Sequence, residues 1–178
     1  SLVISSTIPG EGKSLISVLL AKTISQLDKK VLLIDADLRK SQLHKRCGID
    51  NLYGLSNVIT DPNKNWKKAI NQIDKLPNLS LMTAGIRPPD PTRLLGSNKL
   101  KLILNEIENS KEYDFIIVDS PPMLGLSDSS LLSSICDGLV VIVSLNGVDK
   151  SLPIKTFQKI KSSNLPLLGV ITNQVKEP

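Results

Sequence analysis

Residues 7–14 read TIPGEGKS, a glycine-rich segment between the short apolar run Leu2–Ile4 and a strongly apolar stretch. The two glycines permit backbone conformations that a side chain would forbid, so successive N–H groups can point at one anion. A helix that begins at Ser14 adds the positive end of its dipole at the same place. We therefore predict a phosphate-binding loop, in which Lys13 reaches the outer phosphates and the Ser14 hydroxyl serves Mg²⁺.

This loop departs from the general phosphate-loop pattern at one position, because Thr7 stands where that pattern has glycine. An ordinary glycine turn before a helix is the alternative interpretation. The order of an apolar strand, Gly-Lys-Ser and an apolar helix favours the phosphate loop.

Acidic residues follow two further apolar runs. Residues 31–39 read VLLIDADLR, so four aliphatic residues predict a buried strand that leads into Asp35 and Asp37. The segment 113–119, YDFIIVD, ends in the same way at Asp119. Ligands of open α/β sheets bind at the carboxyl ends of the strands, and phosphate-loop enzymes hold Mg²⁺ there. Helix capping or surface solvation is the alternative for each acid alone, but the acids and the loop together predict a nucleotide and metal site.

Strand and helix patterns alternate along the chain, as parallel crossover connections require. With 178 residues, 40% of them hydrophobic, the chain can bury a substantial core. We predict a single α/β domain over residues 1–178, a three-layer P-loop NTPase fold with a mainly parallel central sheet flanked by helices. Later strands are predicted at 79–83, 139–144 and 167–172, and irregular segments at 61–67 and 85–92.

Apolar residues at helical spacing predict the helices that cover this sheet. The first helix is expected to pack through Ile16, Leu20, Ile24 and Leu27, with Leu15, Val18 and Leu19 beside them. Later helices are expected around Leu100, Ile103, Leu104 and Ile107, around Leu131, Leu132 and Ile135, and from Pro153 through Ile154, Phe157 and Ile160.

Composition argues against several other functions. The net charge is +5 but aromatic residues make up only 3%, so scattered lysines on a solvated surface explain the charge better than nucleic-acid binding. Cys47 and Cys136 lack metal-ligand spacing and are expected to be reduced structural thiols. His44, the only histidine, is expected to pack or to cap. No signal peptide or transmembrane run is apparent in the sequence.

Taken together and in order, five segments resemble the catalytic domain of the bacterial tyrosine kinases that regulate capsule and exopolysaccharide synthesis. They are PGEGKS at 9–14, LLIDADLRKSQLH at 32–44, AGIRPPDPTRLL at 84–95, DFIIVDSPP at 114–122 and GVITN at 169–173. That family resembles MinD- and ParA-type ATPases in fold. Those ATPases carry a signature lysine at the position of Ile8, and its absence favours the kinase.

The resemblance implies a protein-tyrosine kinase with ATP and Mg²⁺ as cofactors. It implies that Lys13 binds the β- and γ-phosphates, that Asp35 faces the incoming tyrosine hydroxyl, and that Asp37 shares the catalytic work. The residues it implies for ATP binding are Pro9, Gly10, Glu11, Gly12, Lys13, Ser14, Leu15, Arg39 and Asn173. Those it implies for Mg²⁺ are Ser14, Asp37 and Asp119.

The resemblance also implies partners. They are a transmembrane activator, fused or separate, and the carboxyl-terminal tyrosine cluster of neighbouring subunits in a homo-oligomer at the inner face of the cell membrane. The chain starts at its first strand and contains only Tyr53 and Tyr113 as tyrosines. We therefore expect a fragment without the amino-terminal oligomerisation helix and the tyrosine cluster, which labels itself weakly but phosphorylates an added tyrosine-rich peptide.

Three departures from the family pattern lie outside the phosphate loop. Ser41 stands where the family usually has proline, and Asp90 and Arg93 stand where it usually has asparagine and glutamate. The last two bear on regulatory or subunit contacts rather than on the chemistry. The basic pairs Arg39-Lys40 and Lys45-Arg46 either steer an anionic nucleotide or an acidic tyrosine-bearing tail, or form a plain helix surface.

Two alternative functions remain open from the sequence. One is a MinD- or ParA-like switch ATPase, which positions other molecules rather than phosphorylating tyrosine. The other is a non-catalytic ATP-binding scaffold of a polysaccharide export complex. A pure scaffold would not need the complete set of site residues, namely Lys13, Ser14, Asp35, Asp37 and Asp119.

Overall fold

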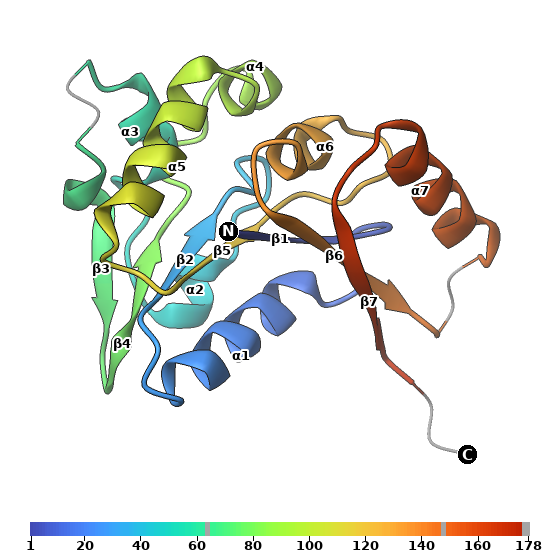
Figure 1. Ribbon diagram of the computed structural model, residues 1–178, viewed down its shortest axis with the longest axis horizontal. Coiled ribbons are helices and arrows are strands. Elements are labelled where there is room, and N and C mark those ends of the chain that lie inside the picture. Colours follow the sequence, from blue (N-terminus) through green and yellow to red (C-terminus); the bar gives the residue numbers. More distant parts are fainter. Residues whose placement is uncertain (63–64, 147–148, 176–178) are drawn as a thin grey trace.

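The computed structural model describes residues 1–62, 65–146 and 149–175, and these form a seven-stranded sheet with helices on both faces (Figure 1). The strand order is β3-β4-β2-β5-β1-β6-β7. The strands are β1 (Leu2–Ser6), β2 (Val31–Asp35), β3 (Ile70–Ile73), β4 (Leu76–Met82), β5 (Phe115–Asp119), β6 (Gly138–Ser144) and β7 (Leu167–Asn173). The helices are α1 (Lys13–Ser25), α2 (Leu43–Cys47), α3 (Leu55–Thr60), the 3₁₀ turn η1 (Trp66–Ala69), α4 (Pro91–Leu95), α5 (Asn98–Ser110), α6 (Asp128–Ser133) and α7 (Ser151–Ser162).

The sheet is parallel except at one edge, where β3 pairs antiparallel with β4. The central strand β5 lies between β2 and β1, and β6 lies on the other side of β1. In this register Asp35 at the end of β2 is paired with Asp119 at the end of β5. The predicted three-layer fold is therefore confirmed, and it brings the acidic strand ends to one edge of the sheet.

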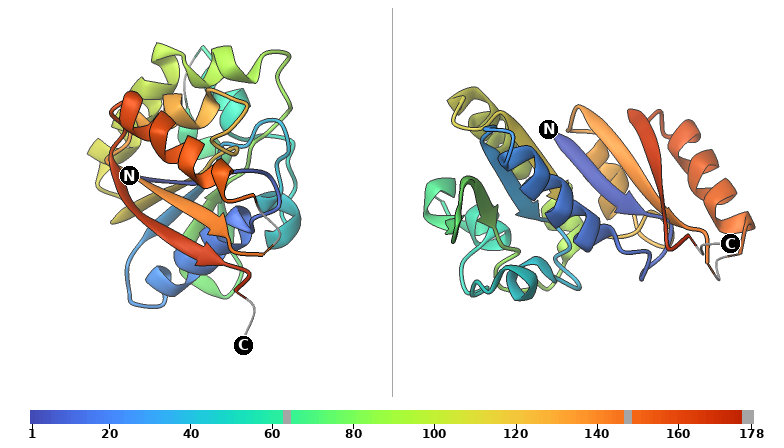
Figure 2. Two further views of the ribbon diagram at one scale, coloured as in Figure 1. Left: turned by 90° about the vertical axis from the view of Figure 1, so that its right-hand side faces the viewer. Right: turned by 90° about the horizontal axis from the view of Figure 1, so that it is seen from below.

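Each face of the sheet buries its own apolar core because successive strand side chains point to opposite faces. On one face, Val3 and Ile34 pack with residues of α3, α5, α6 and α7. On the other face, Ile4 and Leu33 pack with residues of α1 and α2. Figure 2 shows the sheet between these two helical layers.

The buried face of α1 differs from the predicted stripe. The residues that α1 buries fully are small: Ser14, Ser17, Ala21 and Ser25. Ile16, Val18, Leu20 and Ile24 are only partly buried at the sides of this face, and Leu15, Leu19 and Leu27 are exposed. Small side chains let α1 approach the sheet closely, so size rather than apolarity decides which face of this helix is innermost.

The predicted strands are confirmed within three residues at each end, but short elements were missed. The sequence analysis gave no strand at β3, which reads Ile-Asn-Gln-Ile and is only partly buried at the sheet edge. The short helices α2, α3 and α4 were also not predicted. Of the predicted irregular segments, 85–90 contains no helix or strand, α4 begins at Pro91, and residues 63 and 64 lie outside the described residues.

The longest helices in the described part of the chain, α1 and α5, have 13 residues each. A membrane-spanning helix needs about 20 predominantly apolar residues. Among the described residues, no helix is both long enough and apolar enough to cross a bilayer.

Enlarging the buried small face of α1 should destabilise the fold. We expect Ala21→Leu to lower the free energy of unfolding by about 1–3 kcal/mol, because Ala21 is fully buried against the sheet. The matched control is Leu19→Ala on the same helix, which should change the free energy by less than about 0.5 kcal/mol since Leu19 is 52% exposed. Urea unfolding curves measure both, and an unaffected Ala21→Leu variant would contradict this assignment of the buried face.

Candidate active site

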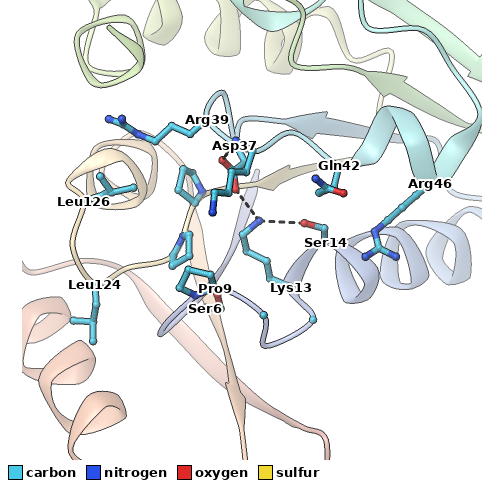
Figure 3. A pocket seen from close by; sticks show the side chains of 15 residues that line it. Ser6, Pro9, Lys13, Ser14, Asp37, Arg39, Gln42, Arg46, Leu124 and Leu126 are labelled. Atoms are coloured by element: carbon cyan, nitrogen blue, oxygen red, sulfur yellow. Dashed lines mark hydrogen bonds and ion pairs between the residues drawn. The ribbon is translucent and has the colours of Figure 1, made fainter. Parts of the chain in front are cut away.

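A pocket of about 500 Å³ opens at the carboxyl ends of β1, β2 and β5 (Figure 3). Its walls come from the phosphate loop, from the segment between β2 and the end of α2, and from the segment after β5. The lining residues are Ser6, Pro9, Gly10, Gly12, Lys13, Ser14, Asp37, Arg39, Lys40, Gln42, Arg46, Pro121, Pro122, Leu124 and Leu126.

The phosphate loop has the conformation that its glycines were predicted to allow. Gly10 has φ 91° and Gly12 has φ 89°, a region that residues with side chains rarely adopt. Helix α1 begins at Lys13, one residue before the predicted start. Thr7 has no positive φ and is buried, with its backbone N–H donating to the Ile142 carbonyl oxygen at 3.4 Å. This position therefore does not require glycine in this chain.

Glu11 fastens the phosphate loop to the rest of the sheet. Its carboxylate is buried and accepts hydrogen bonds from the backbone N–H groups of Ile8 and Ser144, both at 2.9 Å. The Asn173 side-chain amide donates to the Glu11 carbonyl oxygen at 2.9 Å. A Cβ atom on Gly12 would lie 2.4 Å from that amide nitrogen. Glu11 and Asn173 thus brace the loop from behind, and neither lines the pocket.

The ammonium group of Lys13 lies among three oxygen atoms that were predicted to serve a metal. Its Nζ atom is 3.1 Å from Ser14 Oγ, 3.3 Å from Asp37 Oδ2 and 3.5 Å from Asp119 Oδ2. The Asp119 Oδ2 atom is buried and accepts no hydrogen bond in the described part of the chain. Mg²⁺ prefers oxygen ligands and is commonly held by one or two carboxylates with phosphate and water completing its shell. These donors fit that ion together with phosphate and water, since no group of three or more acidic, histidine or cysteine side chains among the described residues could hold a metal ion by itself.

Burial controls the charge of the acids at this edge. Burial raises the pKa of Asp119, and the nearby Lys13 partly offsets this effect. Ser17, one turn along α1, donates to Asp119 Oδ1 at 3.0 Å and favours the charged form. Burial also raises the pKa of Asp35 to about 6, and the neighbouring charge of Asp119 adds to that rise.

Asp35 organises the chain that follows β2. Its Oδ1 accepts from the Asp37 N–H at 3.2 Å. Its Oδ2 accepts from the Ser41 hydroxyl at 2.8 Å and from the backbone N–H groups of Gln42 and Leu43 at 3.2 and 3.1 Å. Asp35 is fully buried and does not line the pocket. Proline at position 41 would lack this hydroxyl, so the departure at Ser41 adds a donor to Asp35 in this chain.

Arg39 connects the pocket to two helices on the far face of the sheet. Its Nε donates to Asp128 Oδ2 at 2.9 Å, and its Nη2 donates to Thr92 Oγ1 at 2.7 Å. Asp128 is fully buried at the start of α6, so this ion pair satisfies a charge that would otherwise be costly. Asp90, the second family departure, caps α4 by accepting from the Arg93 N–H at 3.1 Å.

Lys159 of α7 holds the loop after β5. Its Nζ donates to the carbonyl oxygens of Met123 and Leu126 at 2.7 and 2.6 Å. Burial lowers the pKa of Lys159. Leu124 and Leu126 of the same loop line the pocket, so a side chain from a distant helix fixes one pocket wall.

The pocket gathers most, but not all, of the residues that the sequence singled out. Those that line it are Pro9, Gly10, Gly12, Lys13, Ser14, Asp37 and Arg39. Asp119 does not line the pocket but contacts the Lys13 ammonium group, Asp35 lies within the protein, and Leu15 is exposed on α1. Ser17, Asp128 and Lys159 also act at or around the pocket, and the sequence did not predict them. Only Ser17 could have been found from the sequence, because it lies one helical turn after Ser14. The partners of Asp128 and Lys159 are far from them in the sequence, so no local spacing indicates these contacts.

Comparison with known proteins gives the same family over nearly the whole chain. The AAA domain family model matches residues 2–167. The tyrosine-protein kinase YwqD of Bacillus subtilis (strain 168) is 36% identical over 99% of this chain and 73% of its own length. The putative tyrosine-protein kinase CapB of Staphylococcus aureus is 33% identical over 98% of this chain and 75% of its own length.

Solved structures show the same fold. The chimerical protein CapA2B2 is similar with a TM-score of 0.92 and 29% identity, covering 99% of this chain and 76% of that one. The kinase domain of the Escherichia coli tyrosine kinase ETK is similar with a TM-score of 0.90 and 30% identity, covering 98% and 67%. MinD, in the MinC:MinD cell division complex of Aquifex aeolicus, has a TM-score of 0.83 and 25% identity, covering 98% and 69%.

The buried carboxyl group of Asp35 should make stability depend on pH with a defined sign. Its pKa is raised from 3.8 to about 6, so between these values the folded chain holds a proton that the unfolded chain has released. The stabilisation from this group is complete at low pH and is lost as the pH rises through about 6, a fall of up to about 3 kcal/mol. Urea unfolding of the metal-free and nucleotide-free protein should show this slope, and Asp35→Asn should remove it. If the free energies of unfolding of the unaltered chain and of Asp35→Asn changed with pH in the same way, the raised pKa of Asp35 would be contradicted.

The two hydrogen bonds from Lys159 to the Met123 and Leu126 carbonyl oxygens are here called the Lys159 clasp. Removing them should loosen one wall of the pocket. We expect Lys159→Met to lower the free energy of unfolding by about 1–3 kcal/mol, because two carbonyl oxygens lose a charged donor. Amide hydrogen exchange should accelerate in residues 121–127, and Lys159→Arg should partly restore protection. Lys161→Met on the same helix is the matched control and should leave that segment protected. Equal exchange in both methionine variants would show that the clasp does not hold the loop.

Proposed function

The chain belongs to the bacterial tyrosine-protein kinases, and on that premise we propose that it transfers the γ-phosphate of ATP to a tyrosine hydroxyl through the pocket at the ends of β1, β2 and β5. The observation that carries this proposal is the convergence of Ser14, Asp37 and Asp119 on the Lys13 ammonium group, beneath a phosphate loop. This arrangement provides the cation and the metal ligands that phosphoryl transfer requires.

The residues of the pocket divide the work of phosphoryl transfer. The backbone N–H groups of the phosphate loop bind the phosphates, and Lys13 turns from its two carboxylates towards the β- and γ-oxygens. Ser14, Asp37 and Asp119 would hold Mg²⁺, which supplies neutralisation of the charge on the transferred group. Most of the rate enhancement then comes from charge placed in advance around the phosphate.

We propose that Asp35 orients the phenol and takes its proton late in the transfer. A tyrosine hydroxyl has a pKa near ~10, so an ordinary aspartate with a pKa near ~4 is a poor base for it. The raised pKa of Asp35, about 6, makes it a better one. Because Oδ2 of Asp35 is occupied by Ser41, Gln42 and Leu43, this role requires the 41–43 segment to release the carboxylate when substrate binds.

The cellular setting that we propose follows from the family resemblance. The domain would lie at the cytoplasmic face of the cell membrane and act with a transmembrane activator, fused or separate. Its substrate would be the tyrosine cluster of a neighbouring subunit in a homo-oligomer. Through this reaction it would regulate the synthesis and export of capsule or exopolysaccharide.

A switch ATPase is the second candidate, because the MinD fold is similar over 98% of this chain. That class usually needs a lysine where this chain has Ile8. Here the backbone N–H of Ile8 is instead held by the Glu11 carboxylate. A non-catalytic scaffold is disfavoured by the intact set of charged groups around Lys13.

Phosphate transfer from labelled ATP to a tyrosine-rich peptide tests the proposal. With Mg²⁺, the chain should produce phosphotyrosine, and Asp35→Asn should reduce transfer by at least about 100-fold, the usual contribution of a general base. ATP affinity should stay nearly unchanged in that variant, whereas Lys13→Met should weaken it. Full kinase activity in Asp35→Asn would remove Asp35 from its role. ATP hydrolysis without any phosphotyrosine would favour the switch ATPase.

A further inference from the structure

We propose that Lys40 and Arg46, here called the cationic wall, select tyrosines that are flanked by acidic residues. This inference rests on the proposed kinase function and names the class of peptide that the same pocket accepts. The observation behind it is that some of the positively charged side chains that line the pocket have a protein carboxylate as partner, whereas Lys40 and Arg46 have none among the described residues.

Four cationic side chains line the pocket, and two of them are neutralised by the protein itself. Lys13 lies between the carboxylates of Asp37 and Asp119 at 3.3 and 3.5 Å. Arg39 is paired with the buried Asp128 at 2.9 Å. These two cations therefore have protein carboxylates as partners. Lys13 forms with Asp37 and Asp119 the group here called the catalytic edge, and Arg39 stabilises the fold.

The cationic wall has no such partner. Among the described residues, neither the Lys40 nor the Arg46 side chain has a carboxylate within 4.0 Å, and both are exposed. The Lys40 backbone is nevertheless fixed beside the catalytic edge, because its N–H donates to Asp37 Oδ1 at 2.9 Å. Arg46 extends from α2 towards the Ser14 side of the pocket (Figure 3). Two positive charges without a carboxylate partner among the described residues thus line the pocket that holds the phosphate loop.

Another part of the pocket lining is suited to an aromatic ring. It is formed by Pro121, Pro122, Leu124 and Leu126, here called the apolar wall. The Lys159 clasp fixes the loop that carries it. A tyrosine side chain has an apolar ring and a polar hydroxyl, so its ring can pack on the apolar wall while acidic neighbours pair with the cationic wall.

The nucleotide is the other anion that the cationic wall could serve. Its phosphates already have the loop N–H groups, the α1 dipole and Lys13 as partners. A peptide has none of these, so it gains more from the free charges. Lys45, next to Arg46 on α2, is exposed but does not line the pocket and provides a matched control.

The test compares two peptides that differ only in the residues around one tyrosine, four glutamates in the first and four glutamines in the second. For the unaltered chain, kcat/KM should favour the acidic peptide on the order of fivefold, as expected for two partly exposed ion pairs. The Lys40→Gln/Arg46→Gln double variant should reduce this ratio to about one, and Lys45→Gln should leave it. The ratio should also fall as salt is raised, because exposed charges are screened.

Three outcomes would overturn the inference: equal use of the two peptides, a preference that survives the double variant, or a double variant that loses ATP affinity with no change in preference. Failure of the kinase function itself would appear differently, as no phosphotyrosine on either peptide. In that case fluorescent peptides with phenylalanine in place of tyrosine are titrated with ADP and Mg²⁺ present. Tighter binding of the acidic peptide that the double variant loses supports the cationic wall, and equal binding overturns it.

Discussion

The structure depends on keeping two buried carboxylates and one lysine in contact at the ends of three strands. A buried charge without a partner is strongly destabilising, so Asp37 and Asp119 need Lys13 as much as Lys13 needs them. The parallel register of β2 and β5 and the helix that starts at Lys13 satisfy this requirement together. The catalytic edge is thus also a structural centre, and a bound metal and nucleotide would take over contacts that the ammonium group makes here.

Other buried acids fix the loops that surround this edge. Asp35 collects four donors and thereby shapes the segment from Asp37 to Leu43, while Asp128 holds the Arg39 side chain. Glu11 does the same for the phosphate loop. Each of these loops is therefore held by hydrogen bonds to a buried carboxylate in addition to any apolar packing.

Much of the fold and of the phosphate loop could be predicted, because long aliphatic runs and glycine spacing are local signals. The buried face of α1 was predicted only in part, because Ile16, Leu20 and Ile24 pack against the core but are not its innermost residues. The periodicity of Leu and Ile says nothing about the close approach that Ser17 and Ala21 allow. Strand β3 was missed because its pattern is short and half polar. The Lys159 clasp and the Arg39–Asp128 pair join residues more than 30 positions apart, and no spacing rule encodes such contacts.

The catalytic edge alone does not separate a kinase from a switch ATPase, because phosphate binding and charge neutralisation serve transfer to water as well as to a phenol. The difference must lie in what the pocket admits beside the phosphate. In this chain the same pocket is lined by prolines and leucines and by two cations that have no carboxylate partner among the described residues. An apolar surface favours a ring over water, and free cations favour an anionic segment over a neutral one. Walls of this kind suit a peptide acceptor, so the side chains outside the shared phosphate motif are the ones that define the reaction.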